Sequence, residues 1–180
     1  MAVTQSRGMP VGTPAPPFSL PGVDGRTRDL ASFDADVLVV VFTCNHCPYA
    51  IANEDRLIAL ARDYEGRADV VAISANDATR YAADSFDAMK KRSDDKGFNF
   101  PYLYDESQEV ARAYDAACTP DPFVFDRDRK LVYNGRIDDN WQDESAATRR
   151  DLRAAIDAAL AGEAVGFDVA PAMGCSIKWK

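Results

Sequence analysis

The sequence lacks the features that mark membrane proteins and nucleic-acid-binding proteins. Its longest apolar run, Val37 to Phe42, is far shorter than the roughly 18 residues that a membrane-spanning helix needs. It also lacks a basic excess, because 29 acidic residues against 21 Lys and Arg give a net charge of -8. Binding to phosphate backbones requires clustered Lys and Arg. We therefore expect neither a nucleic acid nor a membrane among its partners.

The N-terminus also lacks a secretory signal. Residues 1–7 hold no apolar stretch and no small-residue cleavage site. This absence favours the cytoplasm, where thiols are kept reduced and closely spaced cysteines are catalytic or bind metal. No internal repeat or low-complexity tract divides the 180 residues. We therefore expect a single domain over residues 1–180, with a lead-in at about 1–16 and a C-terminal tail at about 163–180.

Hydrophobic patterning predicts an α/β fold. Val37 to Phe42 is apolar at every position, which is typical of a strand buried on both faces in the middle of a sheet. Asp24-Gly25 predicts a hairpin turn, Ser85 an N-cap and Gly97 a helix end. The expected strands are 18–20, 27–30, 37–42, 70–74, 100–103, 123–125 and 131–133, and the expected helices are about 48–64, 85–96, 108–114 and 146–161. Strands that alternate with helices and end in an antiparallel hairpin form a mixed β-sheet flanked by helices.

The stretch Cys44-Asn45-His46-Cys47 follows the buried strand and opens the next helix. The first turn of a helix has unpaired N–H groups and the positive end of the macrodipole, and both stabilise a thiolate. Cysteines in such motifs have pKa values of about 3.5–7.5. We therefore expect Cys44 to be an exposed nucleophile at the helix entrance. Cys47, one turn further, is expected to be buried and to resolve the mixed disulfide.

Two other interpretations of these cysteines stay open. In one, both are buried core residues without chemistry. In the other, Cys44, His46 and Cys47 bind zinc or copper. Structural zinc takes four ligands and His46 is the only histidine, so Cys118 and Cys175 would have to complete the shell. We predict no metal and no cofactor.

Longer stretches of the chain carry a resemblance to a known family. They are Gly12 to Pro21 with Asp24-Gly25, Phe42 to Tyr49, Asp84 to Lys90, Phe100 to Asp105, Cys118 to Asp121 and Gly174 to Trp179. Over nearly its whole length the chain resembles the thioredoxin superfamily, in its peroxiredoxin-like branch of bacterial AhpC/TSA-type proteins. The resemblance implies a thioredoxin fold with an N-terminal β-hairpin extension and a βα insertion.

The resemblance also assigns roles outside the motif. Pro120 takes the position of the cis-proline that faces the cysteine pair in thioredoxin-fold proteins. Thr119 would then offer its backbone to a bound polypeptide as to an added strand. Cys118, which the fold brings near the pair, is either a small buried hydrophobic residue or a further redox thiol. Cys175 is either an ordinary thiol of the tail or a resolving cysteine.

The sequence departs from the residue patterns of both thioredoxins and peroxiredoxins. Thioredoxins carry Trp one residue and a buried Asp six residues before the first cysteine, where this chain has Thr43 and Leu38. Peroxiredoxins carry Pro-x-x-x-Thr/Ser-x-x-Cys, and neither Cys44 nor Cys47 is preceded by that pattern. The position of their arginine is taken by Pro120. The peroxide-binding residues of peroxiredoxins are therefore missing.

His46, directly before the second cysteine, resembles the oxidising members of the superfamily. A partial positive charge there favours the thiolate and raises the redox potential. Those relatives lie near about -180 and -120 mV, against a cytosolic poise of about -220 to -320 mV, so such a pair rests reduced. The alternative is that His46 is a solvated turn residue. Thr43 and Asn45 complete the residues that we expect to modulate the site.

These observations favour a thiol–disulfide oxidoreductase with a role in antioxidant defence and redox homeostasis. Its expected partners are a disulfide-containing protein or small thiol as substrate, and a thiol reductant such as a thioredoxin or glutathione system. The alternative enzyme is a peroxiredoxin-like thiol peroxidase, in which Cys44 becomes a sulfenic acid and Cys47 or Cys175 condenses with it. The alternative of another class is a metal-binding thioredoxin-like domain.

Overall fold

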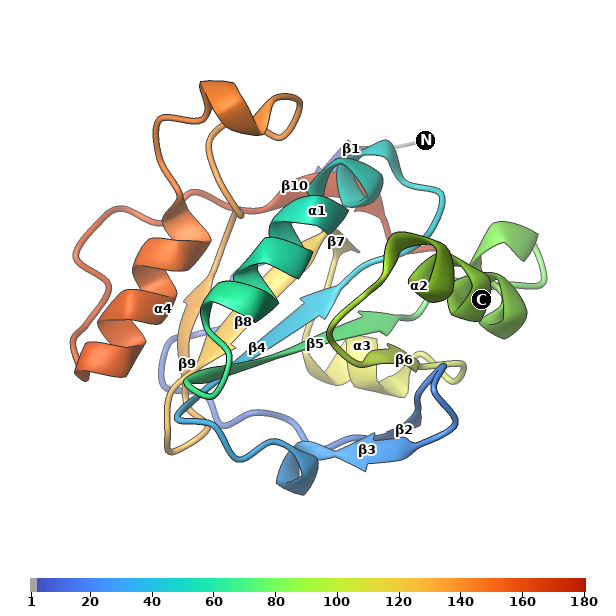
Figure 1. The fold of residues 1–180 in the computed structure, drawn as a ribbon, viewed down its shortest axis with the longest axis horizontal. Helices are drawn as coiled ribbons and strands as arrows, with labels where there is room; N and C mark the ends of the chain where they lie inside the picture. The colour runs from blue at the N-terminus through green and yellow to red at the C-terminus, as the bar shows by residue number, and fades with distance from the viewer. Residues whose placement is uncertain (1–2) are drawn as a thin grey trace.

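The computed structural model describes residues 3–180 and is built around a five-stranded mixed sheet (Figure 1). Across the sheet the strands are β6 (Tyr102–Tyr104), β5 (Ala68–Ser74), β4 (Val37–Phe42), β8 (Asp121–Phe125) and β9 (Leu131–Asn134). β4 runs parallel to β5 and antiparallel to β8, and β8 and β9 form the expected hairpin. All of β4 is buried, as its sequence predicts for a central strand.

Helices cover both faces of this sheet (Figure 1). They are α1 (Pro48–Asp63), α2 (Phe86–Lys96), α3 (Glu109–Ala113) and α4 (Asp151–Ala161), with short 3₁₀ helices η1 (Leu30–Ser32), η2 (Ala82–Asp84) and η3 (Glu144–Ala146). Because side chains alternate along a strand, Leu38 and Val40 of β4 contribute to one core with α3. Val37 and Val39 contribute to the other core, with α1, α2 and α4.

The helix ends follow the sequence signals. Pro48 begins α1, where its missing N–H has no intrahelical partner to lose. The Ser85 hydroxyl accepts the N–H of Ala88 and caps α2. Gly97 and Gly162 end α2 and α4 in the left-handed region, with φ of 66° and 71°. The predictions for Ser85 and Gly97 are confirmed.

The fourth helix begins later than the sequence predicts. We expected it to start near Ala146, whereas α4 starts at Asp151. The Asp139 carboxylate accepts the N–H groups of Thr148 and Arg149. Since these N–H groups are bonded to a side chain, the segment before α4 is irregular rather than helical.

The predicted N-terminal hairpin is present. Its strands, β2 (Ser19–Pro21) and β3 (Thr27–Asp29), pair in an antiparallel manner around the turn at Gly25. A bridge between Gly22 and Leu103 joins the hairpin to the edge of the sheet at β6, where Figure 1 shows it.

The two ends of the chain meet in a second sheet that the sequence analysis did not predict. Its strands, all antiparallel, are in order β1 (Val3–Gln5), β10 (Met173–Ser176) and β7 (Cys118–Thr119). The expected lead-in and the expected tail therefore each contain a strand. β10 also packs against α1, so the C-terminal segment lies beside the start of the helix that follows the cysteine motif (Figure 1).

A mixed sheet flanked by helices, with the cysteine motif between the central strand and the first helix, is the thioredoxin-like α/β fold predicted from the sequence. No helix among residues 3–180 is long and apolar enough to cross a membrane.

Candidate active site

The cysteine motif connects β4 to α1. β4 ends at Phe42, and the chain turns before Pro48 begins the helix, so Cys47 is the N-cap residue of α1. The N–H of Ala50, in the first turn, helps to lower the pKa of Cys47. The predicted strand–cysteine–helix order is confirmed, but the cap position belongs to Cys47 rather than to Cys44.

Both cysteines of the motif are buried. The exposed fraction is 2% for Cys44 and 0% for Cys47, so the prediction of an exposed Cys44 is wrong, although Cys44 is the more exposed of the two. The two side chains form one cluster with Ala50 of α1 and Cys175 of β10, and Tyr49 packs against it. The C-terminal strand is therefore part of the cover that buries the pair.

Thr119 contacts both sulfur atoms. Its hydroxyl lies 3.4 Å from the Cys44 sulfur, and its carbonyl oxygen lies 3.1 Å from the Cys47 sulfur. The peptide bond between Thr119 and Pro120 is cis, as the resemblance implied. The predicted grouping of the cysteine pair with Thr119 and Pro120 is thus present in the structure.

The two thiols share a proton. The Cys44 thiol donates to the Cys47 sulfur, and this contact, helped by the Ala50 N–H, lowers the pKa of Cys47 to about 4. The same contact, followed by burial and by the negative charge of Asp84, raises the pKa of Cys44 well above its ordinary value. The pair therefore carries one negative charge at neutral pH, which the two coupled sulfurs share. The expected placement of that charge on Cys44 stays a prediction.

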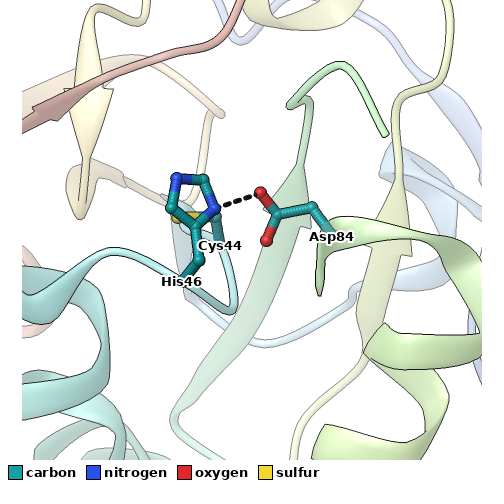
Figure 2. A group of neighbouring side chains, drawn as sticks. All are labelled: Cys44, His46 and Asp84. Atoms are coloured by element: carbon teal, nitrogen blue, oxygen red, sulfur yellow. Dashed lines mark hydrogen bonds and ion pairs between the residues drawn. The ribbon is translucent and has the colours of Figure 1, made fainter. Parts of the chain in front are cut away.

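His46 is paired with an aspartate that the sequence analysis did not single out. Its Nδ1 lies 2.6 Å from Oδ2 of Asp84, at the end of η2 (Figure 2). The ring of Tyr81 stacks on the imidazole at 5.0 Å between centroids. Nε2 of His46 is buried and has no hydrogen-bond partner within residues 3–180. Because Asp84 compensates any positive charge on His46, the expected electrostatic support of the thiolate by His46 is weakened.

Asp84 organises the Cys44 side of the site. It is fully buried, and besides His46 it accepts the backbone N–H of Asn45 at 2.7 Å and the amide of Asn76 at 2.8 Å. Asp84 opens one of the stretches that carry the family resemblance, yet no spacing rule links it to the cysteines. That stretch was the available signal, and its acidic residue was overlooked.

Three side chains at this place can act as metal ligands. Cys44, His46 and Asp84 each offer one ligand atom, and these atoms lie within 4.8 Å of one another (Figure 2). The metal interpretation from the sequence used Cys47 instead of Asp84. A structural zinc site takes four ligands, and the group found among residues 3–180 supplies three, of which the imidazole and the carboxylate already bond to each other.

Thr43 and Asn45 support the turn of the motif. The N–H of Thr43 donates to the carbonyl of Ile73, which continues the pairing of β4 with β5. The Asn45 amide donates to the carbonyl of Ala83 at 2.7 Å and accepts the hydroxyl of Tyr102 at 3.0 Å. Both residues hold the backbone around Cys44 in place.

Cys175 lies in β10, directly opposite Thr119. The register pairs these two residues, and the Thr119 hydroxyl donates to the Cys175 carbonyl at 3.5 Å. The Cys175 side chain is 3% exposed and its thiol hydrogen-bonds with Cys47. Burial, followed by the contact with Cys47, raises the pKa of Cys175 to about 11. The structure therefore brings Cys175 to the pair.

The edge that Thr119 was expected to offer to a polypeptide is covered by the chain itself. β10 pairs with β7 along this edge, and Gly174 lies so close to the Thr119 carbonyl that a Cβ atom there would clash with it. The expected docking edge is therefore wrong for this conformation, because a strand of the same chain occupies it.

Cys118 lies close by but faces away from this chemistry. It is fully buried, its thiol donates to the Pro120 carbonyl at 3.6 Å, and it does not belong to the cluster of the other three cysteines. Burial raises the pKa of Cys118 well above its ordinary value, which makes it a poor nucleophile. Its surroundings favour the interpretation as a small buried hydrophobic residue.

A cavity of about 270 Å³ opens next to the cis-proline. Pro120, Met173 of β10, and Asn53 of α1 contribute to its wall. Trp141 also lines it and packs at a tilt against Tyr49, the second residue of α1, at 4.1 Å between ring centroids. The cavity offers room for a small molecule or a loop at one flank of the site.

Comparison with known proteins places these features in a family. Residues 11–134 match the AhpC/TSA family. Among solved structures, an uncharacterized conserved protein from Geobacillus kaustophilus is 46% identical with a TM-score of 0.95, covering 100% of this chain and 97% of its own. A hypothetical protein from Sinorhizobium meliloti is 43% identical with a TM-score of 0.93, covering 98% of each chain.

A more distant likeness concerns the fold alone. A secreted disulfide oxidoreductase from Mycobacterium tuberculosis is 20% identical with a TM-score of 0.61, covering 78% of this chain and 95% of its own. A search of curated proteins finds no match. The family match covers the motif, the cis-proline loop and the central sheet, so the chain belongs to the AhpC/TSA family of thioredoxin-like proteins.

Proposed function

We propose that the protein is a thiol–disulfide oxidoreductase that works through Cys44 and Cys47. The observation that carries the proposal is the pair itself, in which two thiols at the start of α1 share one proton beside the cis-Pro120 loop. Disulfide exchange requires an activated thiolate and a resolving thiol within bonding reach, and this pair supplies both.

The reaction starts from the form of the pair in which its one proton is on Cys47. The Cys47 thiol then donates to the Thr119 carbonyl oxygen, 3.1 Å from its sulfur, and the negative charge is on Cys44. The Cys44 thiolate attacks a substrate disulfide, and one substrate thiolate leaves. Cys47 then attacks the Cys44 sulfur, and the second substrate thiol leaves with the proton. The protein keeps the Cys44–Cys47 disulfide, which a thioredoxin or glutathione system reduces again.

The covered edge at Thr119 favours a small substrate. A polypeptide that adds as a strand must first displace β10, whereas a low-molecular-mass disulfide needs only the Cys44 sulfur and the space around it. We therefore propose a small disulfide of the glutathione type as the substrate class, with a role in redox homeostasis.

A thiol peroxidase is the second candidate, and the family match favours it. Fast peroxide reduction requires positioned donors for the departing oxygen. Apart from Cys47, the side chain that hydrogen-bonds the Cys44 sulfur is Thr119, and no arginine among residues 3–180 does so. This environment favours exchange over peroxide reduction.

Stopped-flow oxidation of the reduced protein distinguishes the thiol–disulfide oxidoreductase from the thiol peroxidase. Glutathione disulfide and hydrogen peroxide are compared as oxidants, with acid quench and mass analysis of Cys44. We expect Cys44 to react with the disulfide and to react with peroxide no faster than an ordinary thiolate, and the Cys118→Ser control to behave like the wild type. Peroxide oxidation orders of magnitude faster than that of a free thiolate would establish the peroxidase instead.

A further inference from the structure

We propose that Cys175 is a third redox-active thiol that takes over the disulfide from Cys44, so that the oxidised protein comes to hold a Cys47–Cys175 bond. The proposal rests on the proposed function, because the Cys44–Cys47 disulfide is its starting point.

Cys47 interacts with two other thiols of the site. Its sulfur hydrogen-bonds with the thiols of both Cys44 and Cys175. The three side chains belong to one buried cluster, and Cys118 lies outside it. Sulfur atoms in hydrogen-bond contact need only a small movement to reach the bond length of about 2.05 Å. Cys47 can therefore bond to either neighbour.

β10 presents Cys175 as a bound substrate strand would present its own cysteine. It pairs with β7 in a register that places Cys175 opposite Thr119, the residue that contacts both Cys44 and Cys47. The close approach of Gly174 to the Thr119 carbonyl holds this register. The C-terminal strand thus acts as an internal substrate for the pair.

The protonation states suit a thiol that receives the disulfide second. Cys175 keeps its proton at neutral pH, because burial and the contact with Cys47 raise its pKa to about 11. It therefore reacts with an incoming disulfide more slowly than the Cys44–Cys47 pair, which carries a negative charge at neutral pH. Lys178, three residues further along, lowers the pKa of Cys175 slightly and eases its later deprotonation.

The transfer balances without an external reagent. The Cys175 sulfur attacks the Cys47 sulfur of the Cys44–Cys47 disulfide, the Cys47–Cys175 bond forms, and the bond to Cys44 breaks. Cys44 leaves with the electron pair and takes up the proton that Cys175 gives away. Cys175 is oxidised and Cys44 is reduced by the same amount. The oxidised bond thereby moves from the motif to the C-terminal strand.

The tryptic map of the chain makes the test direct. Trypsin leaves Cys44 and Cys47 in one peptide, residues 29–56, Cys118 in residues 113–127, and Cys175 in residues 154–178. A Cys44–Cys47 disulfide closes a loop inside one peptide, whereas a Cys47–Cys175 disulfide joins two peptides. The two products therefore have different masses.

Reduced protein is mixed with one equivalent of glutathione disulfide, quenched in acid at increasing times, alkylated, digested and analysed by mass spectrometry. In the wild type the loop is expected first, followed by the joined pair with Cys44 alkylated. The second step is expected to accelerate about tenfold per pH unit below the pKa of Cys175, as thiolate formation requires. Cys175→Ser and Cys175→Ala give the loop only, and Cys118→Ser behaves like the wild type.

Each contrary outcome has a definite meaning. A loop that persists in the wild type without any joined pair overturns the transfer and leaves the proposed function intact. A joined pair that forms in Cys44→Ser at the wild-type rate also overturns it, because Cys44 would then not be the donor. The absence of any oxidation of Cys44 overturns the proposed function and the transfer with it.

Discussion

The two cysteines of the motif face chemically different sides of the site. On the side of Cys44 lie Asp84 and His46, which contact each other through the Asp84 carboxylate and the imidazole Nδ1. On the side of Cys47 lie the first turn of α1 and the thiol of Cys175. Two identical side chains three residues apart therefore differ in pKa in opposite directions. The contact between the two sulfurs is the largest cause of both shifts, and neighbours from distant segments, Asp84 for Cys44 and Cys175 for Cys47, add to them.

The largest effect on the rate of oxidation is expected from removing the Cys44 sulfur, on the side of Asp84 and His46. Cys44→Ser leaves Cys47 alone and fully buried, so oxidation by glutathione disulfide should fall on the order of 10³-fold or more, as for the loss of a nucleophile. Cys118→Ser, a change of another buried thiol, should keep the wild-type rate. The rates are measured by acid quench and mass analysis, and equal rates in both variants would contradict the assignment of Cys44.

The second prediction concerns the side of Cys47, where β10 covers the site. A Cβ atom at Gly174 clashes with the Thr119 carbonyl, so Gly174→Ala should push β10 away from β7 and destabilise the protein by roughly 1–3 kcal/mol. Alkylation of Cys47 and reduction of a protein disulfide should both accelerate, because the Thr119 edge opens. Gly166→Ala, where a Cβ meets nothing within 4 Å, is the control. Identical urea unfolding and alkylation of the two variants would show that β10 does not cover the site.

The third prediction concerns the side of Cys44 and removes the charge of Asp84 while keeping the size of its side chain. Asp84→Asn removes a negative charge within 4.8 Å of the Cys44 sulfur, so the pKa of Cys44 should fall by about one unit. Below that pKa, alkylation of Cys44 should accelerate by up to about tenfold, measured against pH in a Cys47→Ser background. Asp87→Asn, on the exposed surface of α2, is the control. No shift relative to that control would show that Asp84 does not act on Cys44.

The smallest effect is a pH titration of the pair itself. The pKa of Cys47 is lowered to about 4, whereas burial or sulfur contacts raise the pKa of the other three thiols. One thiolate should therefore be present from pH 8 down to about pH 4, where it becomes protonated. Thiolate absorbance in the ultraviolet measures it, with Cys47→Ser expected to lose the signal and Cys118→Ser to keep it. A wild type without any thiolate at pH 6 would refute the negative charge of the Cys44–Cys47 pair.

The parts of the site that depend on local sequence could be predicted. The apolar run of β4, the cysteine motif and Pro48 at the start of α1 act within one short stretch, and the family resemblance supplied the cis-Pro120. The order of strands and helices in the fold could also be predicted, because it follows from the hydrophobic pattern within each segment.

The parts of the site that depend on pairing between distant strands could not be predicted from the sequence. β1 and β10 are strands of three and four residues from opposite ends of the chain, too short to show a period, and Gly174 and Pro171 in or near β10 are unfavourable in strands. The burial of Cys44, the covered Thr119 edge and the position of Cys175 all follow from that pairing. Asp84 was missed because a single acidic residue has no pattern that ties it to Cys44.

The central claim is that Cys44 attacks and Cys47 resolves. The most direct measurement mixes Cys47→Ser with glutathione disulfide and locates the glutathione adduct by peptide mass analysis. The account predicts that this variant accumulates a mixed disulfide on Cys44, whereas the wild type passes through it and ends with an internal disulfide. An adduct on Cys118 or Cys175, or none on Cys44, would contradict it.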